Sequence, residues 1–296
     1  MNLRKKRPQH DVKYIAMAVK EWGNEPLCTI TTDMVDKLVK KYARQLKKRT
    51  GKYAERLKAR GGLMTAPNRL LSSIRSCLQK AREAKLITEN PAIWVDKTLE
   101  GPPRSRVLSD DEMHSLLVAL GTWSNEHERA AFLLLVMTGA RLSEVLRAKW
   151  SDVDLDAGEW RIPSPKAGHP QTVPLAAGTV AMLRQLDRVG QLIIPGASNP
   201  DRPRYDLKGP WDRLRTAAGL PTDVHIHDVR RSFGLRVARA AGLHVASKLL
   251  RHGDVRITAK VYAPLGLDEL RKATEQHTGQ LATVLEMQPK KQGAGS

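Results

Sequence analysis

The chain has only two cysteines among its 296 residues, Cys28 and Cys77. Two cysteines are too few for a disulfide framework, and by themselves they cannot supply the ligands of a structural zinc site. The sequence also lacks a run of about 18 apolar residues, which is the length that a membrane-spanning helix needs. Its longest apolar run, AAFLLLVMTGA, contains Gly139 and stops before Arg141. The basic start MNLRKKRPQHD is followed by no apolar stretch, unlike a secretory signal. We therefore expect a cytoplasmic protein with no membrane partner.

Acidic residues are in deficit. The chain has 31 Asp and Glu against 50 Lys and Arg, a net charge of +19. Residues 1–100 hold 23 basic and 10 acidic residues, a net of +13, which leaves +6 for the remainder. A surplus of this size favours a polyanionic partner, most commonly nucleic acid. A ribosomal protein, a membrane-surface protein or a solvated basic face would give the same composition, so charge alone does not decide.

The length favours about two domains. Apolar residues at helical spacing predict two helices over residues 12–47, and Thr31 or Thr32 can cap the second. A further strong helix is expected to open at Thr65 and Pro67. These helices predict a small, very basic, all-helical domain.

A composition change separates that domain from the rest. Residues 97–106, KTLEGPPRSR, combine Gly, two prolines and mixed charge, and they indicate a linker. The first domain is therefore expected over residues 1–98 and the second over residues 107–287, with a disordered tail at 288–296. Ser109 and Glu112 have the spacing of a capping box that begins the first helix of the second domain.

The second domain mixes two periodicities. A buried helix is expected at 130–137 and another at 142–149. The period then changes from 3.6 to 2, which predicts three short strands at 150–154, 159–163 and 171–175. The rest returns to helix, with Gly219, Gly242 and Gly253 as breaks. The expected fold class is mainly α with a small antiparallel β-sheet.

Two basic side chains fall at breaks between elements. Arg141, in TGARLSE, lies where one helix ends and the next begins, so backbone N–H groups and a guanidinium fork can meet an anion there. A structural ion pair with nearby Glu144 explains the same arginine. Lys166 lies in the turn of the 159–175 hairpin, where a lysine is ordinarily a solvated charge.

Two further motifs lie near the end of the second domain. His227 and Arg230 are three residues apart, so on a helix they share one face and can point at one phosphate, while Arg231 faces elsewhere. His252, in LRH, is followed ten residues later by Tyr262, one of five tyrosines. Each motif alone is weak, because HxxR occurs by chance and a tyrosine commonly belongs to a core.

Taken in order, these motifs resemble the tyrosine recombinases, the phage-integrase family. Residues 105–265 contain, in this order, TGARLSE, the hairpin lysine before TVPL, HDVRRSF, LRH and VY. The weaker pattern of residues 12–95, with Asn68-Arg69 and Asn90-Pro91, is similar to the core-binding domain of the family.

The resemblance implies a site-specific recombinase that cleaves and rejoins DNA through a 3′-phosphotyrosine, giving integration, excision or resolution. It assigns these roles: Tyr262 as the nucleophile, Arg141 and Arg230 on the non-bridging phosphate oxygens, Lys166 as general acid at the leaving 5′ oxygen, His227 assisting proton transfer, and His252 hydrogen-bonding the phosphate. No metal or cofactor is expected.

The chemistry fits those residue types. A free tyrosine has a pKa of about 10, so only about a thousandth is phenolate at neutral pH. Attack therefore needs a proton acceptor or a strongly positive site, and the phosphorane-like state needs fixed positive charge. The sequence has no obvious Asp/Glu cluster for magnesium, so the cations would replace the metal. Because the phosphotyrosine link keeps the bond energy, a free 5′ hydroxyl can reverse it without ATP.

The resemblance also implies partners. The two domains would form a C-shaped clamp around double-stranded DNA, with salt-dependent phosphate contacts. Candidate contacts are Lys40, Lys41, Lys47, Lys48, Arg49, Arg69 and Arg75, although such lysines also serve solubility. A leucine-bearing helix after Tyr262 would dock on a neighbouring subunit in a synaptic tetramer, or pack on its own domain. Accessory DNA-bending proteins are compatible with this assembly.

The sequence departs from the family pattern at two places. Arg251 stands where the family commonly has glycine, and it can add a phosphate contact there. The interval from His252 to Tyr262 is one residue longer than the commonest spacing.

A type IB topoisomerase shares the chemistry, but small size and a separate N-terminal helical domain favour a recombinase. A non-catalytic architectural DNA-binding protein is disfavoured by the intact set of six catalytic residues.

Overall fold

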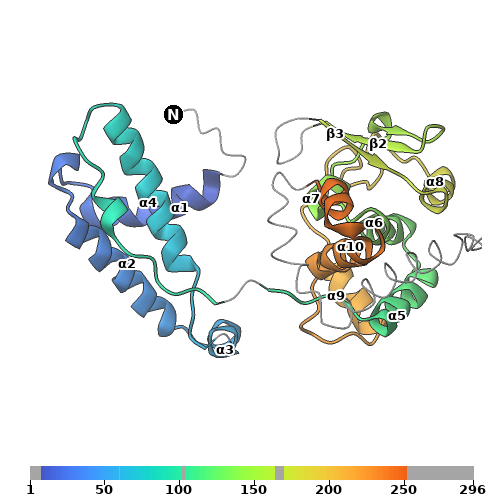
Figure 1. Ribbon diagram of the computed structural model, residues 1–296, viewed down its shortest axis with the longest axis horizontal. Coiled ribbons are helices and arrows are strands. Elements are labelled where there is room, and N and C mark those ends of the chain that lie inside the picture. Colours follow the sequence, from blue (N-terminus) through green and yellow to red (C-terminus); the bar gives the residue numbers. More distant parts are fainter. Residues whose placement is uncertain (1–7, 60, 102–103, 164–169, 252–296) are drawn as a thin grey trace, which may run out of the picture. The chain divides into compact units, whose positions relative to one another are not determined.

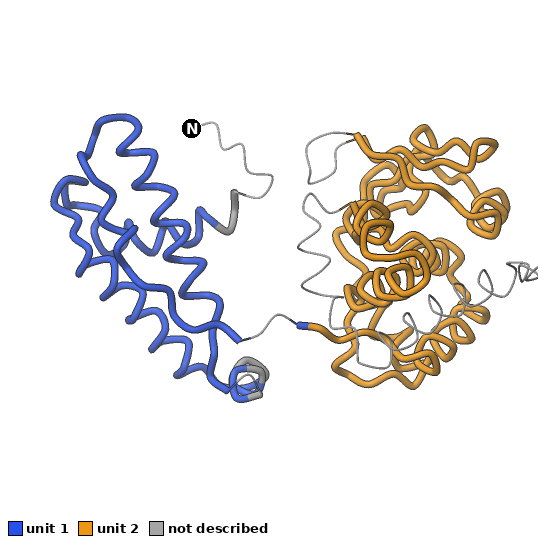
Figure 2. Tube along the Cα trace, viewed as in Figure 1, with its two compact units in different colours: residues 1–104 blue, residues 105–296 orange. Residues whose placement is uncertain are grey.

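The chain forms two compact units, residues 1–104 (unit 1) and residues 105–296 (unit 2) (Figures 1 and 2). The computed structural model describes residues 8–59, 61–101, 104–163 and 170–251. Within the described part of the chain, no helix is both long and apolar enough to cross a membrane.

Unit 1 is all-helical (Figure 1). Its elements are α1 (Pro8–Trp22), η1 (Leu27–Thr29), α2 (Thr32–Lys47), α3 (Lys52–Ala59), α4 (Ala66–Glu83) and η2 (Pro91–Trp94). Helices α1 and α2 both pack on α4, and the buried faces of α2 and α4 supply much of the core. The helices predicted within residues 12–47 and after Thr65 are confirmed, and Thr31 caps α2 by accepting a hydrogen bond from the Met34 backbone N–H. The sequence reasoning missed α3.

A reciprocal pair of polar side chains fixes η2 to α4. The Arg75 guanidinium donates from Nε to the carbonyl of Ala92 at 2.8 Å and from Nη2 to the carbonyls of Ile93 and Val95. Asn90 donates from Nδ2 to the carbonyl of Arg75 at 3.0 Å. Buried polar groups are stabilising when they are paired in this way. Arg75 is therefore part of the internal hydrogen bonding of unit 1.

Unit 2 is helical with one small sheet (Figure 1). Its elements are α5 (Asp110–Gly121), α6 (Glu126–Thr138), α7 (Leu142–Val145), η3 (Trp150–Asp152), β1 (Val153–Asp154), β2 (Glu159–Ile162), β3 (Gln171–Pro174), α8 (Ala177–Arg184), α9 (Lys208–Ala217) and α10 (Ile226–Leu250). The strands are antiparallel in the order β1-β2-β3, with Trp160 opposite both Val153 and Val173. The expected fold class, mainly α with a small antiparallel sheet, is confirmed.

Two further predictions for unit 2 are also confirmed. Ser109 and Glu112 form both hydrogen bonds of a capping box at the start of α5. Helix α6 covers the predicted buried run and contributes Phe132, Leu134 and Leu135 to the core.

Two predicted elements were wrong in extent. The helix expected over 142–149 ends at Val145, and Trp150–Asp152 is a 3₁₀ turn rather than strand. The reason is a backbone pairing with a distant segment. The Ala148 carbonyl accepts from the Ile193 N–H at 2.9 Å, and the Trp150 N–H donates to the Gln191 carbonyl at 3.1 Å. Local periodicity carries no information about such a partner.

Helix α10 is broken at Gly242, as its position in the sequence predicted. Gly242 has φ of 86° and ψ of 162°, outside the helical region. Arg230 nevertheless donates a hydrogen bond to the carbonyl of Leu250, twenty residues later. In one straight helix these residues would lie about 30 Å apart. The chain therefore turns back at Gly242 and returns the end of α10 to its beginning.

Candidate functional site

Arg141 lies at the junction between α6 and α7. Gly139 ends α6 in the left-handed conformation, with φ of 59°, and Arg141 is the N-terminal capping residue of α7. The Arg141 backbone N–H donates to Oε2 of Glu144 at 2.8 Å, and Nη1 donates to Oε1 at 2.7 Å. The structural ion pair is thus present, yet a quarter of the Arg141 side chain, 25%, remains exposed.

Arg230 joins this junction to both ends of α10. The residue is 5% exposed, and its guanidinium donates to the carbonyls of Gly139 and Leu250. Arg141 donates from Nη2 to the carbonyl of the next residue, Arg251, at 3.5 Å. Because the two guanidinium groups meet the carbonyls of consecutive residues, the fold brings Arg141 and Arg230 together from positions 89 residues apart in the sequence.

His227 lies in the first turn of α10, beside further charges. Asp228 is fully buried and accepts hydrogen bonds from the His225 N–H at 2.8 Å and from the Arg231 guanidinium. His227 is exposed, and the neighbouring protein removes part of the hydration of its ring. Loss of hydration lowers the pKa of His227 below 6.5, and the charges of Arg231 and Arg230 lower it further against the opposing charge of Asp228. The imidazole is therefore neutral at neutral pH.

Glu144 carries the negative charge at the centre of this group. Burial raises the pKa of its carboxyl, but the charge of Arg251 and the hydrogen bonds from Arg141 outweigh that effect, so the pKa lies below 4.5. Burial also lowers the pKa of Arg251, and the Glu144 charge opposes this shift. Glu144 is therefore ionised and shared between two arginines.

Three of the six predicted catalytic residues lie outside the described residues: Lys166, His252 and Tyr262. The other three, Arg141, His227 and Arg230, lie on the α6–α7 junction and on α10. Arg141, Arg230, Arg231 and Arg251 outnumber the two carboxylates, Glu144 and Asp228, that lie among them. Such a group suits a single oxyanion better than a cation.

The sequence reasoning named neither Asp228 nor Glu144 as a site residue, although both stand three residues after a capping position. It noted that Arg251 could add a phosphate contact. Instead its side chain is 3% exposed and donates to Glu144 at 2.7 Å, so it points into the protein. No signal in the sequence pointed to that contact. Among the described residues, no group of three or more His, Cys, Asp and Glu is arranged to hold a metal ion.

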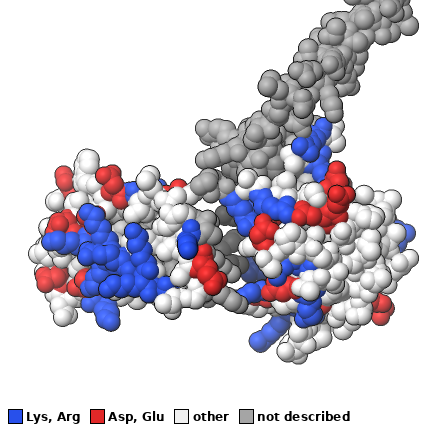
Figure 3. Space-filling view, turned by 90° about the horizontal axis from the view of Figure 1, so that it is seen from below, with Lys and Arg blue, Asp and Glu red and all other residues white. Residues whose placement is uncertain are grey.

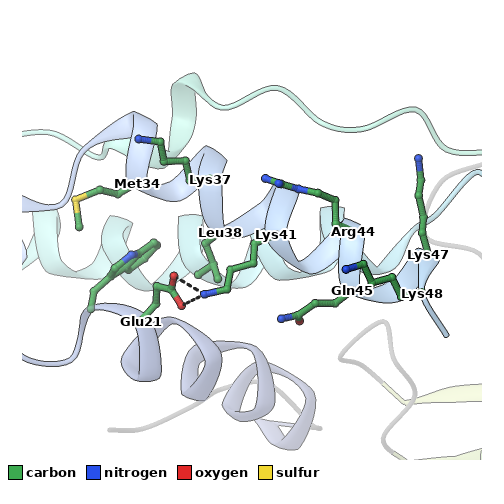
Figure 4. Close-up of a pocket in the computed structure, with 10 residues that line it drawn as sticks. Glu21, Met34, Lys37, Leu38, Lys41, Arg44, Gln45, Lys47 and Lys48 are labelled. Carbon is green, nitrogen blue, oxygen red and sulfur yellow. Dashed lines mark hydrogen bonds and ion pairs between the residues drawn. The ribbon is translucent and has the colours of Figure 1, made fainter.

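A basic groove lies between α1 and α2 of unit 1. Lys and Arg gather on the face of unit 1 seen in Figure 3, and Figure 4 shows the groove. It has a volume of about 760 Å³ and is lined by Glu21, Trp22, Met34, Lys37, Leu38, Lys41, Arg44, Gln45, Lys47 and Lys48. The Lys41 ammonium points at Glu21 and pairs with it at 2.8 Å. The other four cations project along α2 (Figure 4).

The predicted DNA contacts fall into three groups. Lys41, Lys47 and Lys48 line the groove, while Lys40 lies on α2 outside it and pairs with Asp36 at 2.6 Å. Arg49 follows Lys48, the C-terminal capping residue of α2. Arg69 is exposed on α4, whereas Arg75 on the same helix donates to backbone carbonyls of its own unit. The sequence reasoning missed Lys37 and Arg44, although both follow from the spacing of exposed positions on α2.

Comparisons with known proteins bear mainly on unit 2. The family model described as "Phage integrase family" matches residues 106–266, more than half of the chain. A prophage integrase, IntA, of Escherichia coli K12 is 26% identical over 208 residues, which is 63% of this chain and 50% of the relative. Tyrosine recombinase XerD of Pseudomonas putida is 25% identical over 225 residues, 71% of this chain and 74% of the relative. The chain spans about half the length of two of the curated relatives that it matches.

Solved structures carry the same fold. A crystal structure of a lambda integrase fragment, a dimer bound to a COC′ core site, superimposes with a TM-score of 0.68 at 20% identity, covering 90% of this chain and 91% of that one. The Tn1549 transposon integrase bound to transposon right-end DNA gives a TM-score of 0.69 at 17% identity, covering 94% and 95%. At such identities the likeness is evidence for the fold alone. The family model, the order of the motifs and the fold agree: the chain belongs to the phage integrase family.

Proposed function

We propose that the chain is a tyrosine-type site-specific recombinase, which breaks and rejoins DNA strands through a 3′-phosphotyrosine at Tyr262. The observation that carries the proposal is the convergence of Arg141 and Arg230 on the end of α10. Their guanidinium groups meet the carbonyls of Arg251 and Leu250. This end immediately precedes His252 in the sequence, and Tyr262 follows ten residues later.

In the proposed cleavage step, the Tyr262 oxygen attacks the scissile phosphorus. Arg141 and Arg230 stabilise the charge on the non-bridging oxygens, because guanidinium groups bind such oxygens with paired, charge-assisted hydrogen bonds. The 5′ oxygen leaves with a proton from Lys166, and His252 hydrogen-bonds the phosphate.

His227 has the protonation state that this chemistry needs. Its lowered pKa leaves the ring neutral at neutral pH, so it can accept the phenolic proton directly or by relay. In the reverse step, a 5′ hydroxyl attacks the phosphotyrosine, and the tyrosine leaves. The phosphotyrosine intermediate is itself a phosphodiester, so the cycle exchanges one phosphodiester for another and needs no ATP. The cationic side chains take the place of a metal.

DNA binding is assigned to both parts of the chain. We propose that residues 1–98 form the core-binding domain, that residues 107–287 form the catalytic domain, and that the cations of α2 contact DNA phosphates. Lys37, Arg44, Lys47 and Lys48 support this, because they line one groove, where Lys37 also pairs with Asp33 at 2.7 Å. The active assembly is a tetramer on double-stranded DNA in the cytoplasm.

Covalent capture tests the proposal. The purified chain is mixed with fragmented DNA from its source and denatured, and the DNA that remains attached to the protein is sequenced beside a Tyr262→Phe control. The proposal predicts adducts enriched at one sequence and absent with the control variant.

The rival functions give other outcomes. Adducts scattered over many sequences, together with relaxation of supercoiled plasmid, would indicate a type IB topoisomerase. Tight, salt-sensitive binding with no adduct from either protein would indicate an architectural DNA-binding protein and contradict the enzymatic proposal.

A further inference from the structure

Arg251 adopts a backbone conformation that its side chain disfavours. It ends α10 with φ of 55° and ψ of 47°, in the left-handed region that glycine occupies without a steric penalty. A long side chain persists at such a position when its surroundings over-determine it. The contacts of the Arg251 guanidinium are therefore the place to look for what holds it.

Those contacts all lie inside the protein. The Arg251 side chain is 3% exposed, and Nη2 donates to Oε2 of Glu144 at 2.7 Å. Nη1 donates to the carbonyl of Leu249 at 2.9 Å. Buried in this way, the guanidinium cannot reach a phosphate that lies at the surface.

Its partner Glu144 is the residue that orients Arg141. Oε1 of Glu144 accepts from Nη1 of Arg141 at 2.7 Å, and Oε2 accepts from the Arg141 backbone N–H at 2.8 Å. The carboxylate therefore fixes both the backbone and the guanidinium of Arg141. A carboxylate that pairs with one arginine alone would also cancel its charge, which is the charge that a phosphate needs.

We propose that Arg251 is a positioning residue: its buried guanidinium neutralises Glu144, so that Glu144 holds Arg141 in place without cancelling the positive charge that Arg141 presents to the phosphate. The three side chains together carry a net charge of +1 with Arg251 and none without it. The carbonyl of Arg251 also accepts from Arg141 at 3.5 Å, so the same residue links the end of α10 to the phosphate-binding arginine. This inference rests on the proposed function.

The test uses the full chain and the variants Arg251→Gly, Glu144→Gln and their combination. Glycine suits the backbone at position 251, so Arg251→Gly removes the guanidinium without straining the turn. Lys85→Gly is the matched control, because exposed Lys85 has φ of 58° and also lies in the left-handed region. Two quantities are measured, Tm and the single-turnover rate of adduct formation on the captured DNA site. The rate is measured on DNA with a phosphate at the scissile position and on DNA with an uncharged methylphosphonate there.

The Tm arm does not depend on activity. Glu144→Gln alone should lower Tm, whereas in the Arg251→Gly background it should lower Tm by less, since the buried carboxylate has already lost one of its two arginine partners. An equal lowering of Tm by Glu144→Gln in both backgrounds would overturn the proposed coupling.

The rate arm tests the charge on Arg141. On the phosphate, Arg251→Gly should slow adduct formation at least tenfold while Lys85→Gly leaves it within twofold, and adding Glu144→Gln should restore it to within threefold of wild type. On the methylphosphonate, which carries less charge for Arg141 to stabilise, the deficit of Arg251→Gly should fall below threefold. A merely structural role predicts equal deficits on both linkages, and that result would overturn the proposal. A wild-type protein that forms no Tyr262-dependent adduct would instead overturn the proposed function, and the Tm arm would still report the coupling of Arg251 and Glu144.

Discussion

The ring of Phe233 lies directly against the backbone of Gly139. A Cβ atom built on Gly139 would stand 2.3 Å from Cδ1 of Phe233, closer than real contacts allow, and Gly139 has φ of 59°. The same glycine accepts a hydrogen bond from Arg230 through its carbonyl. Helix α10 therefore approaches the α6–α7 junction as closely as a residue without a side chain permits, two residues before Arg141.

We predict that Gly139→Ala destabilises unit 2 by about 3 kcal/mol, from left-handed strain of about 1–2 kcal/mol and overpacking of about 1–3 kcal/mol. Gly219→Ala is the control, because Gly219 has φ of 64° but open space around its Cβ position. It should lose only the strain contribution. Calorimetry of the full chain measures both, and equal losses for the two variants would show that the contact with Phe233 does not matter.

Ser232 connects α10 to the segment that precedes α5. Ser232 is 1% exposed, and its hydroxyl accepts from the Leu108 N–H at 2.7 Å and donates to the Asp228 carbonyl at 2.9 Å. Ser232→Ala leaves a buried N–H without an acceptor, so we expect a loss of about 1–3 kcal/mol. Thr216→Ala removes an exposed hydroxyl that donates to a carbonyl on α9 and should stay within about 0.5 kcal/mol. Chemical denaturation that gave the same small change for both would contradict the account of this connection.

The lowered pKa of His227 depends in part on Arg231. Arg231→Gln should therefore raise the pKa of His227, since it removes a positive charge that opposes protonation of the ring. Titration followed by NMR measures this directly, with Arg236→Gln further along α10 as the control. An unchanged His227 pKa in Arg231→Gln would contradict the electrostatic cause.

The same shift fixes the sign of a pH dependence. Because the folded pKa of His227 lies below the unfolded value of 6.5, its contribution to stability is present above pH 6.5 and is lost as the pH falls through the folded pKa. His227→Gln should therefore flatten the decline of Tm between pH 6.5 and more acidic values. A decline of the same steepness in wild type and variant would assign it to other groups.

We predict that the salt dependence of DNA binding responds to substitutions of the groove cations and does not respond to a substitution of Arg75. Each phosphate contact contributes about 0.9 to the slope of log K against log salt concentration. Lys47→Gln with Lys48→Gln should therefore reduce that slope by about 1–2 and leave Tm unchanged. Arg75→Lys should lower Tm, because one ammonium cannot serve three backbone carbonyls, while the slope stays the same. The opposite pattern would place the DNA contact on α4.

The sequence predicted what depends on local order. Capping at Ser109, the buried run of α6, the break at Gly242 and the alternation of β2 and β3 all follow from neighbouring residues. The chemistry of Arg141, His227 and Arg230 was predicted from motif order, although their roles are still proposals.

The failures have one physical cause, contacts between residues far apart in the chain. The helix after Arg141 stops at Val145 because residues 148–150 pair with residues 191–193. Arg75, a candidate DNA contact, donates to carbonyls up to twenty residues away, which its sequence neighbours do not indicate. A phosphate contact was one possibility for Arg251, but its guanidinium donates to Glu144, 107 residues earlier. The local sequence pattern does not predict these long-range contacts.

The position of the covalent bond tests the central claim most directly. Protein carrying captured DNA is digested with nuclease and protease, and the peptides are mapped by mass spectrometry. The account predicts one modified peptide containing Tyr262, its mass raised by a nucleotide joined through a 3′ phosphate, and no modified peptide from Tyr262→Phe. A nucleotide on any other residue, or a 5′ linkage on Tyr262, would contradict it.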